Sequence, residues 1–285
     1  MKFLKVIFSF LSVLVLSSCL SDSDPGIEQY YPNRDAGIAF LEANKSNEGI
    51  VVTNSGLQYK ILAEGSGEVQ SDAGLVKAKV KLIKIDGTVI SNTFTLDEEE
   101  LGYITLASVI PGVYEGVKIM NIGALYKFYV PYELAYGVLQ FENLDPYSAL
   151  IVEIELLEAF DDVAGFFENN ALNENVVVTA SGLQYEVIAK GVGENPSENS
   201  TVKVHYHGTF LNNQVFDSSV DRGETSSFEL SNVIKGFSEG VRLMKPGAKY
   251  KFYMPSDLAY GENGSGVIAP NTPLIFEVEL IEVLD

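Results

Sequence analysis

Both histidines of the chain, His205 and His207, flank Tyr206 in the segment VKVHYHGTFLNNQVFDSS at 202–219. In a β-strand, the two imidazoles would share one face and the tyrosine would lie on the other. Imidazoles at that spacing can bind a metal ion, but a zinc site needs further ligands, and the segment offers no cysteine and no clear carboxylate partner. The pattern therefore predicts half-exposed strand histidines and no metal site.

Nucleophilic and phosphate-binding chemistry are also disfavoured. No serine or cysteine motif of the kind that activates a nucleophile accompanies the histidines. The stretch GENGSG at 261–266 lacks the Gly-Lys-Ser/Thr ending of a phosphate loop, so it is predicted to be a flexible turn. The candidates that remain are Tyr206 and the neighbouring pair Phe216 and Asp217.

The chain contains an internal duplication. VVTNSGLQYK at 51–60 recurs as VVTASGLQYE at 177–186, and KFYVPYELAYG at 127–137 recurs as KFYMPSDLAYG at 251–261. Because the matching blocks keep their order and lie about 125 residues apart, each copy is predicted to be a domain of its own. In the first copy, the stretch equivalent to 202–219 lacks the histidines, the tyrosine and the Phe-Asp pair.

Each copy is predicted to have an α+β fold. Residues 233–244 carry apolar side chains at helical spacing, which predicts one short amphipathic helix against a sheet. A further helix is predicted before each copy, at 36–45 and at 161–172. Apolar and polar residues alternate in the segments predicted to be strands with one buried face, which include 201–210, 248–254 and 274–283. The expected architecture is a curved antiparallel sheet folded around one helix, present twice.

Composition excludes some partners. The formal net charge of −20 disfavours nucleic acid, because phosphate backbones select basic surfaces. Hydrophobic residues make up 46% of the chain, enough for packed cores.

The N-terminus has the features of a targeting segment. Two lysines precede a short apolar run that ends at Cys19, the single cysteine of the chain, which predicts a secretory signal peptide over 1–18. LSSC at 16–19 resembles the bacterial lipobox, in which lipid is attached to the cysteine. This resemblance implies a lipidated tether over 19–34. It also implies a membrane anchor in the bacterial cell envelope, with the outer membrane preferred and the chain facing the periplasm or the cell surface.

Several motifs of the second copy, taken in order, resemble the FK506-binding-protein (FKBP) type of peptidyl-prolyl cis-trans isomerase. They are Tyr206, the pair Phe216–Asp217, VIKGF at 233–237, LAYG at 258–261 and LIFEVEL at 274–280. The helix-preceded VVTASGLQY is similar to the secreted bacterial branch that includes macrophage infectivity potentiators. The resemblance implies a degenerate FKBP-like domain over 35–158 and an isomerase domain with an N-terminal linker helix over 159–285.

In that family an apolar bowl receives the proline ring. Carried over position by position, the resemblance implies six catalytic residues: Tyr206, Phe216, Asp217, Ile234, Tyr260 and Phe276. It implies three further substrate-binding residues: Val233, Phe237 and Ile268. The Ile234 N–H and the Tyr260 hydroxyl would hold substrate carbonyls, and Asp217 would polarise the pocket. The implied partners are X-Pro segments of unfolded or exported proteins and the macrolide inhibitors of the family, with no cofactor.

The chain departs from the family pattern at two positions of the bowl. Tryptophan usually forms its floor, but this chain has none, and Phe237 stands there. Ser226 replaces the first phenylalanine of a Phe-x-Phe pair, of which Phe228 is kept. We expect these changes to alter affinity and substrate preference more than to remove activity.

The first copy has lost most of the implied site. Matching the repeats aligns Val80 with Tyr206, and Ser91 with Asp217. We therefore expect this copy to have little or no activity and to serve as a binder of unfolded chains, a spacer from the membrane or the surface of a homodimer. A second class of function for the whole chain is a membrane-anchored chaperone or interaction module that binds unfolded or proline-containing segments without significant catalysis.

Overall fold

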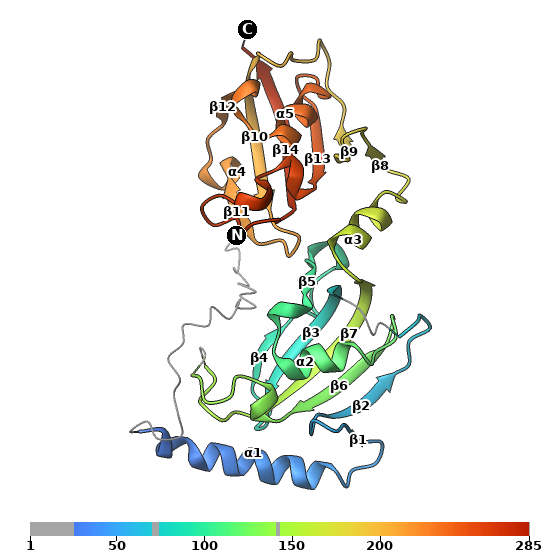
Figure 1. Cartoon of the computed structure of the whole chain (residues 1–285), viewed down its shortest axis with the longest axis vertical. Helices are drawn as coiled ribbons and strands as arrows, with labels where there is room; N and C mark the ends of the chain where they lie inside the picture. The colour runs from blue at the N-terminus through green and yellow to red at the C-terminus, as the bar shows by residue number, and fades with distance from the viewer. Residues whose placement is uncertain (1–25, 70–73, 141–142, 285) are drawn as a thin grey trace. The chain divides into compact units, whose positions relative to one another are not determined.

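A computed structural model describes residues 26–69, 74–140 and 143–284, and the chain divides between Asp162 and Val163 into two compact units (Figure 1). The predicted signal peptide and the lipidated Cys19 lie outside the described residues, so the lipid anchor stays a prediction. In the part of the chain that is described, no helix combines the length and the hydropathy needed to span a bilayer.

The first unit is built on an antiparallel sheet, whose described strands follow the order β1-β2-β6-β7-β3-β4, with β5 paired to β3. Its strands are β1 (Val51–Val52), β2 (Gln58–Ala63), β3 (Leu75–Lys84), β4 (Val89–Asn92), β5 (Ile104–Thr105), β6 (Leu125–Val130) and β7 (Leu150–Phe160). Its α-helices are α1 (Tyr31–Asn44), which precedes the sheet, and α2 (Pro111–Val117), which packs into the core of the unit.

The second unit repeats this topology in the order β11-β10-β14-β13-β9-β8, with β12 paired to β10. Its strands are β8 (Val176–Val178), β9 (Gln184–Ala189), β10 (Thr201–Thr209), β11 (Val215–Ser218), β12 (Ser226–Glu229), β13 (Lys249–Met254) and β14 (Leu274–Val283). Its α-helices are α3 (Val163–Asn170), α4 (Ser219–Arg222) and α5 (Lys235–Arg242). The predicted α+β fold, two antiparallel sheets each with a core helix, is confirmed.

Alternation of apolar and polar residues determines which side chains of the second sheet are buried. In β14, Phe276, Val278 and Leu280 are buried, while Glu277 and Glu279 lie on the opposite face and contact solvent. Strand β10 alternates in the same way and places Tyr206 in the core. The strand predictions for these segments are therefore confirmed.

Helix α5 is shorter than the predicted 233–244. It begins after Ile234, whose extended backbone (φ −59°, ψ 148°) cannot continue a helix. A Cβ added at Gly240 would lie only 2.6 Å from Cε1 of Phe252 in β13, so this glycine lets the helix pack close to the sheet. That close approach brings Phe237, one turn earlier, into the core.

The preceding helix is part of the repeated unit in both copies. In the first, Asn44 donates to Gln58 Oε1 (2.9 Å), and Gln58 donates to the Leu41 carbonyl (2.9 Å). In the second, Asn170 donates to Gln184 Oε1 (2.7 Å), and Gln184 donates to the Phe167 carbonyl (2.8 Å). The same side chains therefore attach each helix to strand β2 or β9 of its own sheet.

The boundaries of these two helices differ from the predicted ones. Helix α1 begins at Tyr31 instead of residue 36, because Pro32 suits a first helical turn, so the helix takes in the end of the predicted tether at 19–34. Helix α3 covers only Val163–Asn170 of the predicted 161–172, since β7 continues to Phe160.

Hydrogen-bond register proves the equivalence of the two copies. Strand β3 pairs Leu82 with Ser91, and β10 pairs Gly208 with Asp217 at the corresponding position. The register shift that follows each pair also occurs at equivalent residues. The alignment of Ser91 with Asp217 is thus a structural fact as well as a match of sequence.

Candidate active site

An aromatic cluster occupies one side of the core of the second unit, and Tyr206 lies at its centre. Its ring centroid is 5.7 Å from that of Phe228 and 6.3 Å from those of Phe237 and Phe276. Phe216 of β11 meets Phe276 edge-on at 5.4 Å. Five elements, β10, β11, β12, α5 and β14, each contribute one of these five rings, and edge-to-face and tilted packing of aromatic rings is favourable.

Gly208 makes the close packing of two of these rings possible. It lies in β10 opposite Phe276 of β14 and opposite Asp217 of β11. A Cβ at this position would lie 2.6 Å from Cζ of Phe216, which is closer than atoms can pack, and 3.0 Å from Cε1 of Phe276, which is also tight. Any larger residue must therefore displace the rings.

A charged network borders the aromatic cluster. The Tyr206 hydroxyl donates to Oδ2 of Asp217 at 2.5 Å, and Arg222 donates to the Tyr206 oxygen at 2.9 Å. Arg222 also forms an ion pair with Asp217, whose side chain is about half exposed. The three side chains form a closed triangle at the edge of the apolar core, which the first copy lacks.

The network determines the protonation state of its members. Burial acts to raise the pKa of Asp217, but the hydrogen bonds from Tyr206 and Arg222 outweigh it, so the pKa lies below its ordinary value. Burial raises the pKa of Tyr206, and the hydrogen bond to Asp217 adds to that rise. At neutral pH the site therefore holds a carboxylate that accepts and a phenol that donates.

Arg222 is the member of this network that the sequence-based prediction missed. It ends helix α4, a single turn that follows β11 directly. In the sequence, Arg222 is marked only by its position five residues after Asp217. That spacing predicts a contact between the two side chains only if the residues between them form a helical turn, which the sequence did not indicate.

The remaining predicted site residues belong to the hydrophobic core of the second unit, which also contains the aromatic cluster. Val233, Ile234 and Tyr260 are partly buried and pack against this core, and Ile268 is buried within it. Among the described residues, no hydrogen bond involves the Tyr260 hydroxyl, and the Ile234 N–H makes no backbone hydrogen bond. Five of the nine predicted site residues, Tyr206, Phe216, Asp217, Phe237 and Phe276, are joined by the ring contacts and hydrogen bonds above, and the other four belong to the same core; their roles in catalysis and binding stay predictions.

The histidines occupy the other face of β10, as predicted. Nδ1 of His205 lies 3.2 Å from the Ser219 hydroxyl, and Nδ1 of His207 lies 2.9 Å from the Ser218 hydroxyl. No group of three or more histidine, cysteine or acidic side chains that could hold a metal occurs in the described parts of the chain. In this structure the two histidines therefore contact serine hydroxyls.

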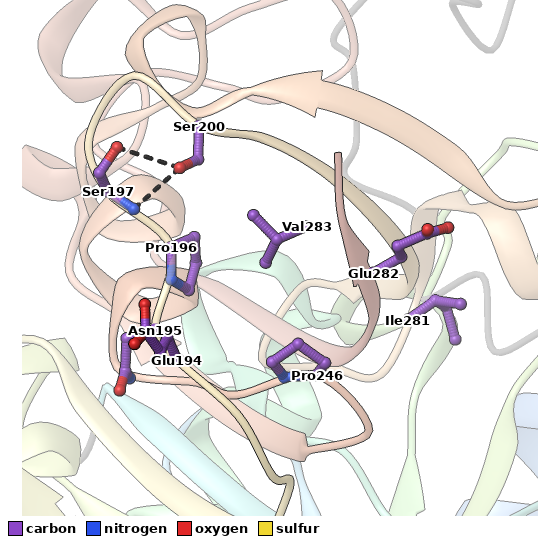
Figure 2. A pocket seen from close by; sticks show the side chains of 9 residues that line it. All are labelled: Glu194, Asn195, Pro196, Ser197, Ser200, Pro246, Ile281, Glu282 and Val283. Atoms are coloured by element: carbon purple, nitrogen blue, oxygen red, sulfur yellow. Dashed lines mark hydrogen bonds between the residues drawn. The ribbon is translucent and has the colours of Figure 1, made fainter. Parts of the chain in front are cut away.

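A wide surface groove of about 500 Å³ lies elsewhere on the second unit. It is lined by residues 194–197, Ser200, Pro246 and residues 281–283 at the end of β14, and Figure 2 shows the hydrogen bonds between Ser197 and Ser200 on one side of it. None of the aromatic or charged groups described above lines it, so it is not part of the candidate site.

In the first copy smaller side chains replace the aromatic cluster. Val80 stands at the position of Tyr206, and Leu82 stands where the second copy has Gly208. Val80, Val113 and Ile104 line an apolar cavity of about 10 Å³, which is roughly the space of one water molecule. A cavity of this size is far below that of ordinary ligand pockets.

Tyr147, which lies three residues before β7, is buried in the first copy. Tyr147 has a left-handed backbone (φ 60°), as does Asn271 at the equivalent position (φ 58°). The tyrosine is only 1% exposed, and its ring packs edge-on against Tyr132 (5.1 Å) and Tyr31 of α1 (6.0 Å). Helix α1 therefore covers Tyr147 through Tyr31, whereas the equivalent Asn271 is exposed in the second copy.

Comparison with known families agrees with this geometry. The family of FKBP-type peptidyl-prolyl cis-trans isomerases matches twice, over residues 67–157 and 193–281, which together make up more than half of the chain. The chain belongs to this FKBP family. The domain amino-terminal to FKBP-type peptidyl-prolyl isomerases also matches, over residues 24–61.

Individual FKBP relatives are similar over part of the chain. FKBP-type peptidyl-prolyl cis-trans isomerase FkpA of Aeromonas hydrophila is 46% identical over 147 residues, which are 49% of this chain and 55% of the relative. Peptidyl-prolyl cis-trans isomerase Mip of Coxiella burnetii is 48% identical over 119 residues, 41% of this chain and 52% of the relative. The crystal structure of FkpA from Escherichia coli is 42% identical with a TM-score of 0.41, covering 41% of this chain and 55% of that one. The chain thus spans about half the length of the curated relatives it matches.

Proposed function

We propose that this FKBP-family chain is a peptidyl-prolyl cis-trans isomerase whose activity lies in the second copy. The observation that carries the proposal is the aromatic cluster around Tyr206, bordered by the Tyr206–Asp217–Arg222 network. The first copy has aliphatic residues and Ser91 at the equivalent positions. The predicted lipid anchor at Cys19 would direct the activity to exported proteins in the bacterial cell envelope.

The reaction suits a site with no acid–base pair. Rotation about an X–Pro bond is slow because the amide has partial double-bond character. The twisted transition state loses that resonance and is less dipolar than either planar isomer. An apolar aromatic surface therefore disfavours the planar substrate more than the twisted form, and this differential binding accelerates rotation.

Polar groups around the cluster would orient the substrate. The Ile234 N–H, just before α5, and the half-buried Tyr260 hydroxyl are both available to substrate carbonyls. Asp217, ionised and held by two donors, provides a fixed negative group beside the aromatic surface. Groups that are already oriented need no reorganisation when the substrate twists.

A protease-coupled assay on a tetrapeptide with an X–Pro bond tests both parts of this proposal. We expect the full chain to accelerate isomerisation and a macrolide inhibitor of the family to suppress the effect. A chain of residues 26–162, which keeps α1 on its own sheet, should show no turnover above background, since it has Val80 and Ser91 at the positions of Tyr206 and Asp217. An inactive full chain would contradict the proposal, and robust turnover by residues 26–162 would show that the first copy is active.

One feature favours a second candidate function, the binding of unfolded segments without catalysis. Both copies expose aliphatic side chains at equivalent positions of one hairpin at the end of the sheet, β1–β2 in the first copy and β8–β9 in the second. These are Val51, Val52 and Leu62 in the first copy and Val177, Val178 and Ile188 in the second, all between 44% and 50% exposed. Short apolar edge strands can pair with extended chains.

Aggregation of an unfolded client protein, followed by light scattering, separates the two functions. If binding is independent of catalysis, the full chain carrying Asp217→Ala and Phe276→Ala should still suppress aggregation, whereas Val177→Ser with Val178→Ser should weaken suppression. If the aromatic site alone recognises the client, the first variant loses suppression and the second keeps it.

A further inference from the structure

Helix α4 depends on a single side-chain cap. The Ser218 hydroxyl accepts the N–H of Asp221 at 3.1 Å, and Ser218 has the extended backbone of an N-cap residue (φ −153°, ψ 115°). Gly223, with φ 75°, ends the helix one turn later. An isolated helical turn is unstable in water, so its cap has a large influence on whether it forms.

His207 of the neighbouring strand β10 lies within hydrogen-bond distance of the Ser218 hydroxyl that caps α4. The register of β10 and β11 places His207 opposite Ser218, and Nδ1 lies 2.9 Å from the serine hydroxyl. Because that oxygen accepts the Asp221 N–H, its own proton is available to the unprotonated Nδ1 of a neutral imidazole. On its other side His207 lies opposite Glu277 of β14, which is paired with Lys249 at 2.5 Å.

The orientation of α4 determines where Arg222 lies. This residue ends the helix and contacts both the Tyr206 hydroxyl and the Asp217 carboxylate. A change in the single turn between Ser218 and Arg222 would therefore move the guanidinium away from both partners.

The first copy provides an internal comparison. It has Lys81 at the position of His207 and Asn92 at the position of Ser218, and Asn92 accepts the N–H of Phe94 at 3.0 Å. In the described residues that follow β4, a turn replaces the α-helix, and Leu96 stands where the second copy has Arg222. The helical turn and its arginine thus occur in the copy that has the histidine–serine pair.

The comparison of the two copies indicates no such role for His205. In the second copy the Ser219 hydroxyl binds the backbone N–H of Tyr206 (2.8 Å) and its carbonyl (3.2 Å). In the first copy Thr93 binds the backbone of Val80 in the same way (2.7 and 3.1 Å), although a lysine stands at the position of His205. The backbone contact therefore forms without this histidine.

We propose that His207 is a positioning residue of the isomerase site, which acts through the Ser218 cap to direct Arg222 toward Asp217 and Tyr206. The proposal rests on the isomerase function proposed for the second copy. It predicts that loss of His207 weakens the charged network while the aromatic cluster stays in place.

The test uses three variants of the full chain: His207→Ala, His207→Asn and, as the matched control, His205→Lys. One readout is the pKa of Asp217, from a carbon-13 NMR titration of its carboxyl group, assigned with Asp217→Asn. The other is kcat/KM for an X–Pro tetrapeptide. In His207→Ala we expect the Asp217 pKa to rise toward its ordinary value and kcat/KM to fall about two- to tenfold, the range of one hydrogen bond. His207→Asn, with an amide near the position of Nδ1, should restore both, and His205→Lys should match the parent chain.

The outcomes separate this proposal from the proposed function. An Asp217 pKa that is unchanged in His207→Ala overturns the positioning role, whether or not activity falls. Loss of activity in both His207 variants with no rescue by asparagine also overturns it, because that pattern reflects general destabilisation. If the parent chain has no turnover, the isomerase proposal fails, but the NMR titration still decides whether His207 positions Arg222.

Discussion

Asp217→Ala is expected to lower kcat/KM of the full chain about 10- to 100-fold without abolishing turnover. The substitution removes the acceptor of the Tyr206 hydroxyl and of Arg222, and hydrogen bonds to charged groups contribute about 1.5–3 kcal/mol. The aromatic rings remain, so catalysis by the apolar surface should persist. The measurement is the protease-coupled assay, with a circular dichroism spectrum to establish that the second unit is folded.

Asp221→Ala is the matched control for this variant. Asp221 lies on the same helix and is exposed, and its contribution to the cap comes from its backbone N–H, which the substitution keeps. Its kcat/KM should stay within about twofold of the parent value. An Asp217→Ala chain that is folded and has unchanged kcat/KM would show that the carboxylate takes no part in the reaction.

Gly208→Leu should reduce turnover to background and lower the free energy of unfolding of the second unit by about 1–3 kcal/mol, the usual cost of overpacking a core. Leucine is the residue that the first copy has at this position. Even its Cβ would lie 2.6 Å from Cζ of Phe216, so the ring must leave its place against Phe276. Urea unfolding and the isomerase assay measure the two effects.

Two further variants make this result specific. Gly208→Ala introduces the same Cβ with less bulk and should cause an intermediate loss of both activity and stability. Leu82→Ala alters the equivalent position of the first copy and should leave isomerase activity unchanged, because the proposed site is in the second copy. Full activity in a folded Gly208→Leu chain would exclude the Phe216–Phe276 contact from the site.

The sequence alone determined the duplication, the fold class and the side of the sheet on which Tyr206 lies. These features could be predicted because they depend on local information. A period of two residues decides which face of β10 or β14 is buried, and the order of repeated blocks decides how the copies correspond. The resemblance of the ordered motifs to the FKBP family then indicated which residues would meet.

Tertiary structure alone decided the contacts that depend on close approach between separate segments. Arg222 contacts Asp217 and Tyr206 only because the capped helical turn α4 returns the chain toward β10 and β11. No periodic pattern in the sequence marks such a turn. Gly208 matters because rings from two other strands pack over it, which its position in the sequence does not show. The burial of Tyr147 beneath α1 likewise joins residues far apart in the chain. Strand periodicity specifies a face, whereas the distance between groups on different elements is decided by how those elements pack.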